Sequence, residues 1–268
     1  MAGSTNGQRG LSAIVLAAGK GTRMQSDLPK VCHEVGGRPM VCAVVDACLE
    51  AGCERVVAVV GYKQELVRDA LSGFGDAVEF AVQSEQHGTG HAVACARDAY
   101  EDVLGSGDPH DAFVLAGDGP LIRPETLRTL LARHRDAGAA AALATSVIDD
   151  PTGYGRIVRD DAGAFLRIVE QKNATETELA IREVNPSYYC FSVPHLFSAL
   201  EKVERNEVSG EYYITDVPEL LLRAGERVEV IDAVPPEDIL SINTPGHLAE
   251  VDAIYRARHA DASGGKGG

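Results

Sequence analysis

The sequence predicts one α/β domain built on a doubly wound, mainly parallel but mixed sheet. Short continuous apolar runs, such as residues 13–18 and 56–60, are typical of strands covered on both faces. Amphipathic stretches with helical spacing lie between these runs, and that alternation indicates βαβ units. A length of 268 residues suffices for one such domain and does not require a second.

The elements alternate regularly in the first half of the chain. Apolar residues recur at helical spacing from Val41 to Leu49, and Gly52 ends that helix. The sequence then predicts a strand at 56–60, a helix at 64–71, a strand at 78–83, a helix at 90–100, a strand at 112–116 and a helix at 124–137.

The second half predicts β-strands inserted over one edge of the sheet. After short strands near 156–158 and 165–170, we expect a strand at 184–191, helices at 194–203 and 216–224, and a strand at 228–233. Thr244 is a suitable N-cap for a last helix, with Pro245 in its first turn. We expect flexible ends at 1–10 and in the Gly-rich tail 260–268, with a single domain at 11–259.

Composition narrows the possible partners and location. The chain has 40 acidic and 25 basic residues, a net charge of −15, which disfavours a nucleic-acid partner. No apolar run approaches the roughly 20 residues of a membrane span, and residues 1–10 lack the apolar core of a secretory signal. The six cysteines include no C-x-x-C pair, so we expect free thiols and a cytoplasmic protein.

The loop after the first strand carries the features of a phosphate-binding loop. Gly19 and Gly21 let the backbone approach a phosphate, while Lys20 and Arg23 bring positive charge. Met24 stands where a dinucleotide fingerprint has its third glycine, which disfavours an NAD-type oxidoreductase, and the chain has no Walker sequence. A glycine-rich turn with surface cations is the alternative.

Seven sequence blocks resemble the sugar-nucleotide pyrophosphorylases, in order, from about residue 11 to about residue 255. The resemblance is closest to the N-acetylglucosamine-1-phosphate uridyltransferase domain. It implies a Rossmann-like nucleotidyltransferase fold with an inserted β-rich sugar-binding region. The blocks are LAAGKGTRM with SDLPKV (16–24 and 26–31), QSEQHGTGHA (83–92), LAGDGPL (115–121), DDPTGYGRIV (149–158), VEQKNAT (169–175), GEYYITD (210–216) and SIN (241–243).

The resemblance implies a Mg²⁺-dependent transfer in which N-acetylglucosamine 1-phosphate attacks the α-phosphorus of UTP and pyrophosphate leaves. Such a transfer needs positioning and charge stabilisation more than a covalent nucleophile. Arg23 and Lys30 resemble the family's catalytic cations, and Asp118 and Asn243 its Mg²⁺ ligands. A solvated lysine and a turn aspartate are the alternatives for Lys30 and Asp118.

The resemblance also implies which residues bind the two substrates. Gln83, Gly88 and Thr89 would recognise uracil, although Gln83 could be a surface amide at a strand end. His91 suggests a general base, but a structural role is favoured. The base and ribose would contact the backbone of Leu16, Ala17, Ala18, Gly19 and Gly21.

Gly155, Glu170 and Asn185 would form the sugar pocket, with Lys172 beside Glu170. Relatives commonly read Asn-Thr-Gly where this chain has Asn185-Pro186-Ser187. Proline removes a backbone donor there, so the sugar identity stays open.

Two further alternatives stay open. One is the same chemistry with another triphosphate or sugar 1-phosphate, and the other is a non-catalytic sugar-nucleotide sensor. Relatives often carry a C-terminal left-handed β-helix that acetylates glucosamine 1-phosphate. This sequence has no such hexapeptide repeat, so we expect no acetyltransferase domain, and the oligomeric state is not predicted.

Overall fold

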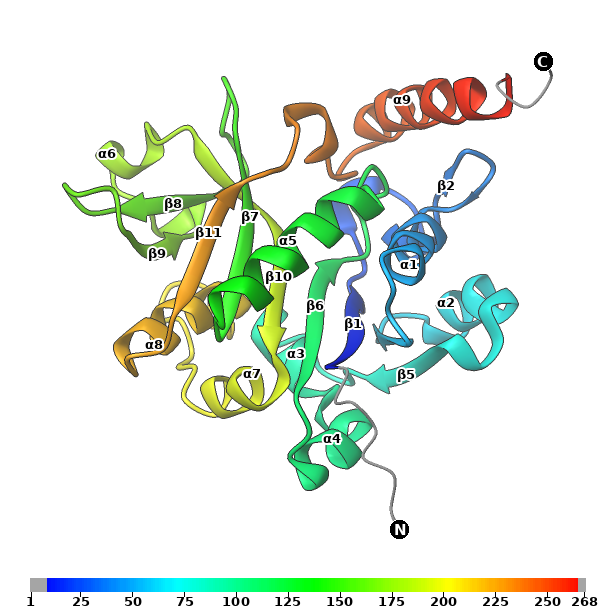
Figure 1. Ribbon diagram of the computed structural model, residues 1–268. Coiled ribbons are helices and arrows are strands. Elements are labelled where there is room, and N and C mark those ends of the chain that lie inside the picture. The colour runs from blue at the N-terminus through cyan, green and yellow to red at the C-terminus, as the bar shows by residue number, and fades with distance from the viewer. Residues whose placement is uncertain (1–8, 265–268) are drawn as a thin grey trace, which may run out of the picture.

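The fold is a twisted mixed sheet with helices on both faces (Figure 1). The computed structural model describes the backbone of residues 9–264 and the side chains of residues 9–260. β10 runs antiparallel to both of its neighbours on the main path, whereas the other adjacent pairs there are parallel. Along that path the strands are β11 (Val228–Asp232), β7 (Ala141–Val147), β10 (Glu183–Ser192), β6 (His110–Ala116), β1 (Gly10–Ala17), β4 (Arg55–Val60) and β5 (Val78–Val82).

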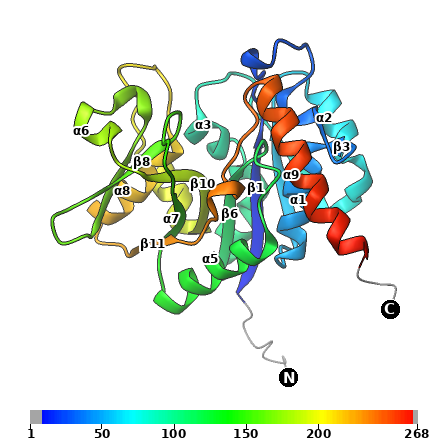
Figure 2. The same cartoon turned by 90° about the horizontal axis from the view of Figure 1, so that it is seen from above.

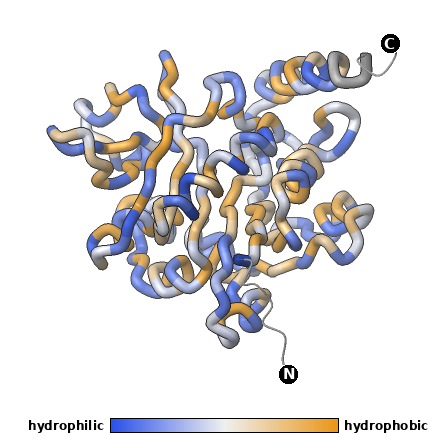
Figure 3. Tube along the Cα trace, in the orientation of Figure 1, coloured by the Kyte–Doolittle hydropathy of each residue, from blue (hydrophilic) through white to orange (hydrophobic). Residues whose placement is uncertain are grey.

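Alternate residues of the central strands enter two separate cores, which is why these strands read as continuous apolar runs. In β1, Val15 packs into one core and Ile14 into the other, and both are fully buried. The helices of the two layers are visible from above in Figure 2, and apolar residues follow the central strands in Figure 3. The first core includes α1 (Met40–Glu50), α2 (Gln64–Leu71) and α5 (Pro124–Ala137), and the second includes α3 (Thr89–Ala94), α4 (Glu101–Ser106), α7 (Val193–Leu200) and α8 (Val217–Arg223).

The predicted β-rich insertion is a hairpin that extends the sheet sideways from β10. β8 (Gly155–Arg159) pairs antiparallel with β9 (Phe165–Val169) and, through Gly155 and Arg156, with Asn185 and Val184 of β10. A short helix, α6 (Glu176–Leu179), follows and begins with a capping box at Thr175. The hairpin therefore places Gly155 directly beside Asn185.

A small hairpin and the last helix pack against Met24, at the end of the predicted phosphate loop. β2 (Glu34–Val35) pairs with β3 (Arg38–Pro39), and the Gly36 N–H between them donates to Asp252 Oδ1 at 2.7 Å. Asp252 belongs to α9 (Pro245–Gly264). Met24, Val35 and Val251 are buried in a third apolar cluster between these segments. The segment that carries Arg23 is thus held under α9.

The structure differs from the sequence prediction at β7 and at the end of α3. The strand β7 was not predicted, because its alanine-rich sequence has low β-propensity; burial between β10 and β11 decides its conformation. The helix predicted at 90–100 is wrong beyond Ala94. A 3₁₀ turn replaces its end, so that fully buried Tyr100 can share a hydrogen bond with Ser12 Oγ at 2.8 Å.

The termini differ in part from the prediction. α9 continues to Gly264, inside the segment 260–268 predicted to be a flexible tail. Residues 1–8 and 265–268 lie outside the described residues. All six cysteines are free thiols, as predicted. Within residues 9–264, no helix combines the length and apolar character that crossing a membrane requires.

A buried ionic cluster lies at the amino end of β6, away from the phosphate loop. The Asp111 side chain is fully buried and pairs with Arg9 at 2.7 Å, Arg135 at 2.8 Å and His134 at 3.0 Å. Burial alone would raise the pKa of Asp111, but hydrogen bonds from His134 and Arg135 outweigh it and lower this pKa. The carboxylate therefore stabilises the fold where it is ionised.

We expect Asp111→Asn to lower the free energy of unfolding at pH 7 by about 3–5 kcal/mol, because arginines would lose their buried counter-charge. The difference from the parent chain should shrink below about pH 4. As pH falls, Asp111 binds a proton in the unfolded chain at a higher pH than in the folded protein, because folding lowers its pKa. The stabilisation that ionised Asp111 gives the fold is therefore lost once pH falls through this lowered pKa. Denaturant titrations of both chains at pH 7 and in acid measure this difference in the free energy of unfolding.

Asp102→Asn is the control, because Asp102 is 69% exposed and pairs with Arg55 only at the surface. It should change the free energy of unfolding by less than about 1 kcal/mol. Equal losses from both substitutions would contradict the role given to Asp111.

Candidate functional site

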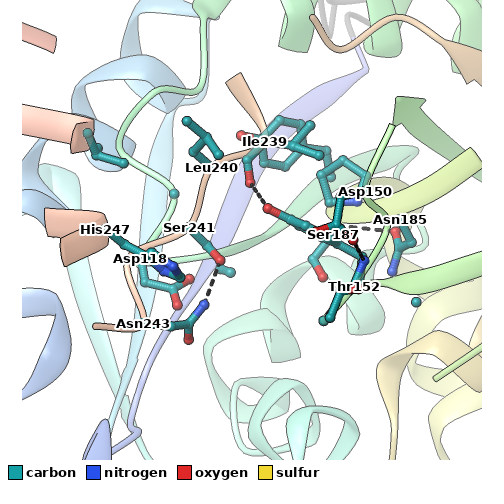
Figure 4. A pocket seen from close by; sticks show the side chains of 18 of the residues that line it. Asp118, Asp150, Thr152, Asn185, Ser187, Ile239, Leu240, Ser241, Asn243 and His247 are labelled. Atoms are coloured by element: carbon teal, nitrogen blue, oxygen red, sulfur yellow. Dashed lines mark hydrogen bonds between the residues drawn. The ribbon is translucent and has the colours of Figure 1, made fainter. Parts of the chain in front are cut away.

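A cavity lies where the carboxyl ends of β1 and β6 meet the inserted β region, the expected place for a ligand in an open α/β sheet. Its volume is about 670 Å³. In Figure 4, Asp118, Ser241, Asn243 and His247 lie on one side and Asp150, Thr152, Asn185 and Ser187 on the other. Six of the predicted site residues line it: Arg23, Asp118, Gly155, Glu170, Asn185 and Asn243.

Two cations and two oxygen ligands converge at one end of this cavity. Lys30 Nζ forms an ion pair with Asp118 and donates to Asn243 Oδ1 at 2.7 Å. Arg23 Nη2 donates to the same oxygen at 2.8 Å. Asn243 Nδ2 donates to Ser241 Oγ at 3.0 Å, which turns the amide oxygen toward the cations. The structure thus brings together the four residues predicted for catalysis and metal binding.

Glycines in the two adjoining loops allow this convergence. Gly21 has φ +67°, and a Cβ there would lie 2.5 Å from Lys30 Cβ, so a side chain at this position would displace Lys30. Gly117, which precedes Asp118, would place a Cβ 2.9 Å from Leu16 O. Close packing of the loops after β1 and β6 therefore requires both glycines.

The donor set fits a Mg²⁺ ion. The Asp118 carboxylate and the Asn243 amide oxygen both contact a positive charge, the Lys30 ammonium, so two hard oxygen donors converge at one point. Mg²⁺ prefers such hard oxygen donors, and it commonly takes only one or two from the protein and the rest from water and substrate phosphates. Among the described residues there is no cluster of three His, Cys, Asp or Glu side chains suited to a metal.

The segment that carries Asn243 is anchored by a buried carboxylate that sequence reasoning did not single out. The Asp238 side chain is 1% exposed and pairs with both Arg123 and Arg258. Tyr188 donates to Asp238 O at 3.0 Å, and Tyr154 to Ile239 O at 3.1 Å. These contacts fix residues 238–243 between α9, the start of α5 and the inserted β region.

Glu170 lies at the other end of the cavity, half-buried, and accepts a hydrogen bond from Thr215 Oγ1 at 3.1 Å. Burial raises the pKa of Glu170, while the Thr215 hydrogen bond and the charge of Lys172 oppose that rise. Thr215 lies in the GEYYITD block, but the sequence offered no reason to separate it from its neighbours. Glu170 is thus a carboxylate that lines the cavity with part of its surface free.

Asn185 is buried beside Gly155, and both polar atoms of its side chain have partners. Its Nδ2 donates to Tyr189 OH at 2.6 Å, and its Oδ1 accepts from Ser187 N at 3.1 Å. Ser187 adopts φ +65°, a conformation that favours glycine, and the Asn185 bond supports it. The departure from Asn-Thr-Gly is therefore accommodated by a turn that keeps Pro186 and Ser187 on the cavity wall.

The residues predicted for the nucleotide do not line this cavity; they lie at or after the carboxyl ends of β1 and β5. Ala18 O, at the end of β1, accepts from Tyr62 N at 3.1 Å and from Gln86 Nε2 at 3.2 Å, which joins the loop after β1 to those after β4 and β5. Gln83 is 3% exposed. Its Nε2 donates to Gly88 O at 3.0 Å. Thr89 Oγ1 accepts from Ile214 N at 3.1 Å, so this hydroxyl holds a loop in place.

Tyr154 and several polar neighbours of the cavity were not predicted as site residues. Asp150, Thr152 and Tyr154 belong to the block DDPTGYGRIV, whose resemblance was the only available signal. Ser241 and His247 reach the cavity from either side of Asn243, on the segment that leads into α9. Their contribution depends on how α9 packs, and no local pattern reports that.

The chain is similar to nucleotidyltransferase proteins. Residues 13–208 match the MobA-like NTP transferase domain family. The chain is 45% identical to the bifunctional protein GlmU of Brevibacillus brevis over 248 residues, which are 92% of this chain and 52% of that protein. It is 44% identical to the bifunctional protein GlmU of Syntrophomonas wolfei over 249 residues, 92% of this chain and 54% of that one. It thus spans about half the length of the curated relatives it matches.

Solved structures with low sequence identity share the fold. A UDP-glucose pyrophosphorylase complexed with UDP-glucose superposes with a TM-score of 0.73 at 16% identity, covering 93% of this chain and 99% of that one. A putative glucose-1-phosphate thymidylyltransferase from Bacillus anthracis, in complex with sucrose, gives 0.75 at 19% identity, covering 92% and 95%. These similarities confirm the predicted Rossmann-like fold.

We expect Asp238→Asn to weaken divalent-cation binding about tenfold, because the anchored segment that presents Asn243 would loosen. Mn²⁺ binding to the whole chain, followed by electron paramagnetic resonance, measures this without any turnover. Asp111→Asn is the matched control, since it too removes a fully buried carboxylate shared by two arginines, but at the amino end of β6. Equal Mn²⁺ affinities in the two variants would show that Asp238 only stabilises the fold.

Proposed function

The chain belongs to the MobA-like NTP transferase domain family, and from this premise we propose that it forms UDP-N-acetylglucosamine and pyrophosphate from UTP and N-acetylglucosamine 1-phosphate. The observation that carries the proposal is the convergence of Arg23, Lys30, Asp118 and Asn243 between a glycine-rich loop and a large cavity. The uridyltransferase-like sequence blocks surround that place. A cytoplasmic location, inferred from the free thiols, is part of the same proposal.

The proposed reaction is an in-line displacement. A phosphate oxygen of the sugar 1-phosphate bonds to the α-phosphorus of UTP, and the bond from that phosphorus to the bridging oxygen of pyrophosphate breaks. Arg23 and Lys30 are close enough to share one acceptor, Asn243 Oδ1, so both can reach one phosphate group. Their charges would hold the triphosphate and stabilise the negative charge of the transition state.

Asp118 and Asn243 would hold Mg²⁺, which neutralises phosphate charge and orients the triphosphate when it is bound. In the structure the Lys30 ammonium contacts these same two residues. Lys30 would therefore turn from them toward a phosphate when the substrates bind. Pro29 has a fixed φ, and Val31 and Cys32 after Lys30 are buried, so the proposed movement is one of the lysine side chain.

We place the base beside the end of β5 and the sugar in the cavity. Gln83 and Gly88 would bind the uracil ring, with the backbone of residues 16–19 against the nucleoside. Glu170 accepts hydrogen bonds and therefore suits sugar hydroxyls, while the Asn185 amide, with its atoms already paired, would act through the spare lone pair of Oδ1. Pro186 offers no N–H to the sugar.

The test of the function is pyrophosphate release in Mg²⁺ buffer across a grid of triphosphates and sugar 1-phosphates. We expect release that is fastest with UTP and N-acetylglucosamine 1-phosphate. Fast release with another sugar 1-phosphate would support the proposed reaction but change the sugar assigned to the cavity. Pro186 and Ser187, which line the cavity in place of the common Thr-Gly, are the reason to test this. UTP binding without release from any pair would identify a sensor and refute the proposal.

We expect Asp118→Asn to reduce turnover at least about 100-fold, because the metal and the triphosphate would lose the carboxylate that pairs with Lys30 beside Asn243. Steady-state rates over a Mg²⁺ titration give the loss, and circular dichroism shows whether the fold is retained. Asp149→Asn is the control, since that carboxylate is 97% exposed and pairs with Arg182. Unchanged turnover in a folded Asp118→Asn variant would remove Asp118 from the metal site.

A further inference from the structure

His91 and Gln83 form a hydrogen-bonded pair that the proposed chemistry does not use. Gln83 follows β5, and His91 lies in the first turn of α3. Gln83 Nε2 is 3.1 Å from His91 Nδ1 and 3.0 Å from Gly88 O. The other ring nitrogen of His91, Nε2, is 3.8 Å from Cys95 Sγ. One amide nitrogen therefore faces two fixed groups.

The Gly88 carbonyl decides which way the Gln83 amide points. A carbonyl oxygen can only accept a hydrogen bond, so the NH₂ end of the amide must face it. The second hydrogen of that NH₂ then points at His91 Nδ1, which must accept it. An imidazole that accepts at Nδ1 carries its hydrogen on Nε2, where the weakly accepting sulfur of Cys95 lies. The contacts thus determine both the amide orientation and the histidine tautomer.

The backbone around Gly88 is held rigidly enough to impose this orientation. Gly88 has φ +102°, and a Cβ there would lie 2.5 Å from Tyr212 O. On either side of it, His87 O accepts from Tyr212 N and Gly90 N donates to Tyr212 O, each at 2.8 Å. The carbonyl of Gly88 therefore cannot turn away without breaking the packing of this loop against the segment near Tyr212.

We propose that His91 is a positioning residue: together with the Gly88 carbonyl it holds the Gln83 amide so that Gln83 reads the nucleobase through its oxygen alone, and so it helps to select uracil over cytosine. Both hydrogens of Gln83 Nε2 are engaged, one by Gly88 O and one by His91 Nδ1, and no donor among residues 9–260 reaches Gln83 Oε1. An accepting oxygen matches the N3–H of uracil, whereas N3 of cytosine carries a lone pair that repels it. This inference rests on the proposed placement of the base beside Gln83.

Loss of the acceptor at residue 91 frees one hydrogen of the amide, so that only Gly88 O opposes its rotation. The rotated amide would present NH₂ to the base and match N3 of cytosine. His91→Leu removes the Nδ1 acceptor and replaces the imidazole with an apolar side chain of similar size. His91→Asn keeps one, because an asparagine oxygen can take the place of Nδ1. His87→Leu is the control, since the centroid of that ring lies 5.2 Å from that of His91, with the two rings tilted by 51°, but His87 hydrogen-bonds Glu85 instead.

The measurement is kcat/KM for UTP and for CTP in each variant, with the KM of the sugar phosphate followed in parallel. We expect His91→Leu to lower the UTP-over-CTP ratio about fivefold, roughly the worth of one neutral hydrogen bond. His91→Asn and His87→Leu should hold the ratio of the parent chain, and the KM of the sugar phosphate should not change. An unchanged ratio in folded His91→Leu would overturn the proposal, as would an equal fall in all three variants.

A second readout needs no turnover and separates this inference from the proposed function. Nitrogen-15 NMR of the whole chain, at a pH where His91 is neutral, should show Nδ1 unprotonated and Nε2 protonated. Calorimetry of UTP and CTP binding should show the same change of preference in His91→Leu. A parent chain that binds UTP but releases no pyrophosphate would refute the function alone. A protonated Nδ1, or equal binding of UTP and CTP by the parent chain, would refute the inference.

Discussion

The contact of the Lys30 ammonium with Asp118 and Asn243 is the interaction on which the site depends. It joins the loop after β1, the loop after β6 and the segment before α9, which approach one another only when the sheet is complete. The Asp118 carboxylate and the Asn243 amide oxygen converge at this point, and the positive charge of Lys30 offsets their negative charge. Arg23 donates to the same Asn243 oxygen. The same geometry suits a metal ion and the phosphates of a nucleotide, since both are held by charge at a fixed place.

The rigidity of this arrangement comes from outside the site. The buried Asp238 carboxylate pairs with Arg123 and Arg258, and two tyrosine hydroxyls, from Tyr188 on β10 and from Tyr154 just before β8, donate to the backbone of the same segment. The two ends of the cavity, at Asp118 and at Asn185, are therefore joined by shared contacts to the segment at residues 238–243. Packing outside the contact also matters beside β5. There, the packing of Gly88 against Tyr212 fixes the carbonyl that accepts from the Gln83 amide.

Much of the fold and the site was predictable because their signals are local. The apolar runs of β1 and β4 follow from burial on both faces, and α2 and α5 begin and end at the predicted residues. The strand β7 was missed because alanines take their conformation from their neighbours, and the helix predicted to end at Tyr100 breaks so that this side chain can reach Ser12. Asp238, Thr215 and Tyr154 carry no local signal, since each acts through a partner distant in sequence.

The sequence by itself determined the α/β class, the glycine-rich phosphate loop and, through resemblance, the identity of the charged residues. Periodicity and residue chemistry are properties of short segments and can be read without the fold. The tertiary structure decided which oxygen faces which cation, how the Asn185-Pro186-Ser187 turn is accommodated, and which way the Gln83 amide points. Those outcomes depend on contacts between segments that only the packed sheet and its helices bring together, because a hydrogen bond requires its donor and acceptor to be held at a specific distance and direction.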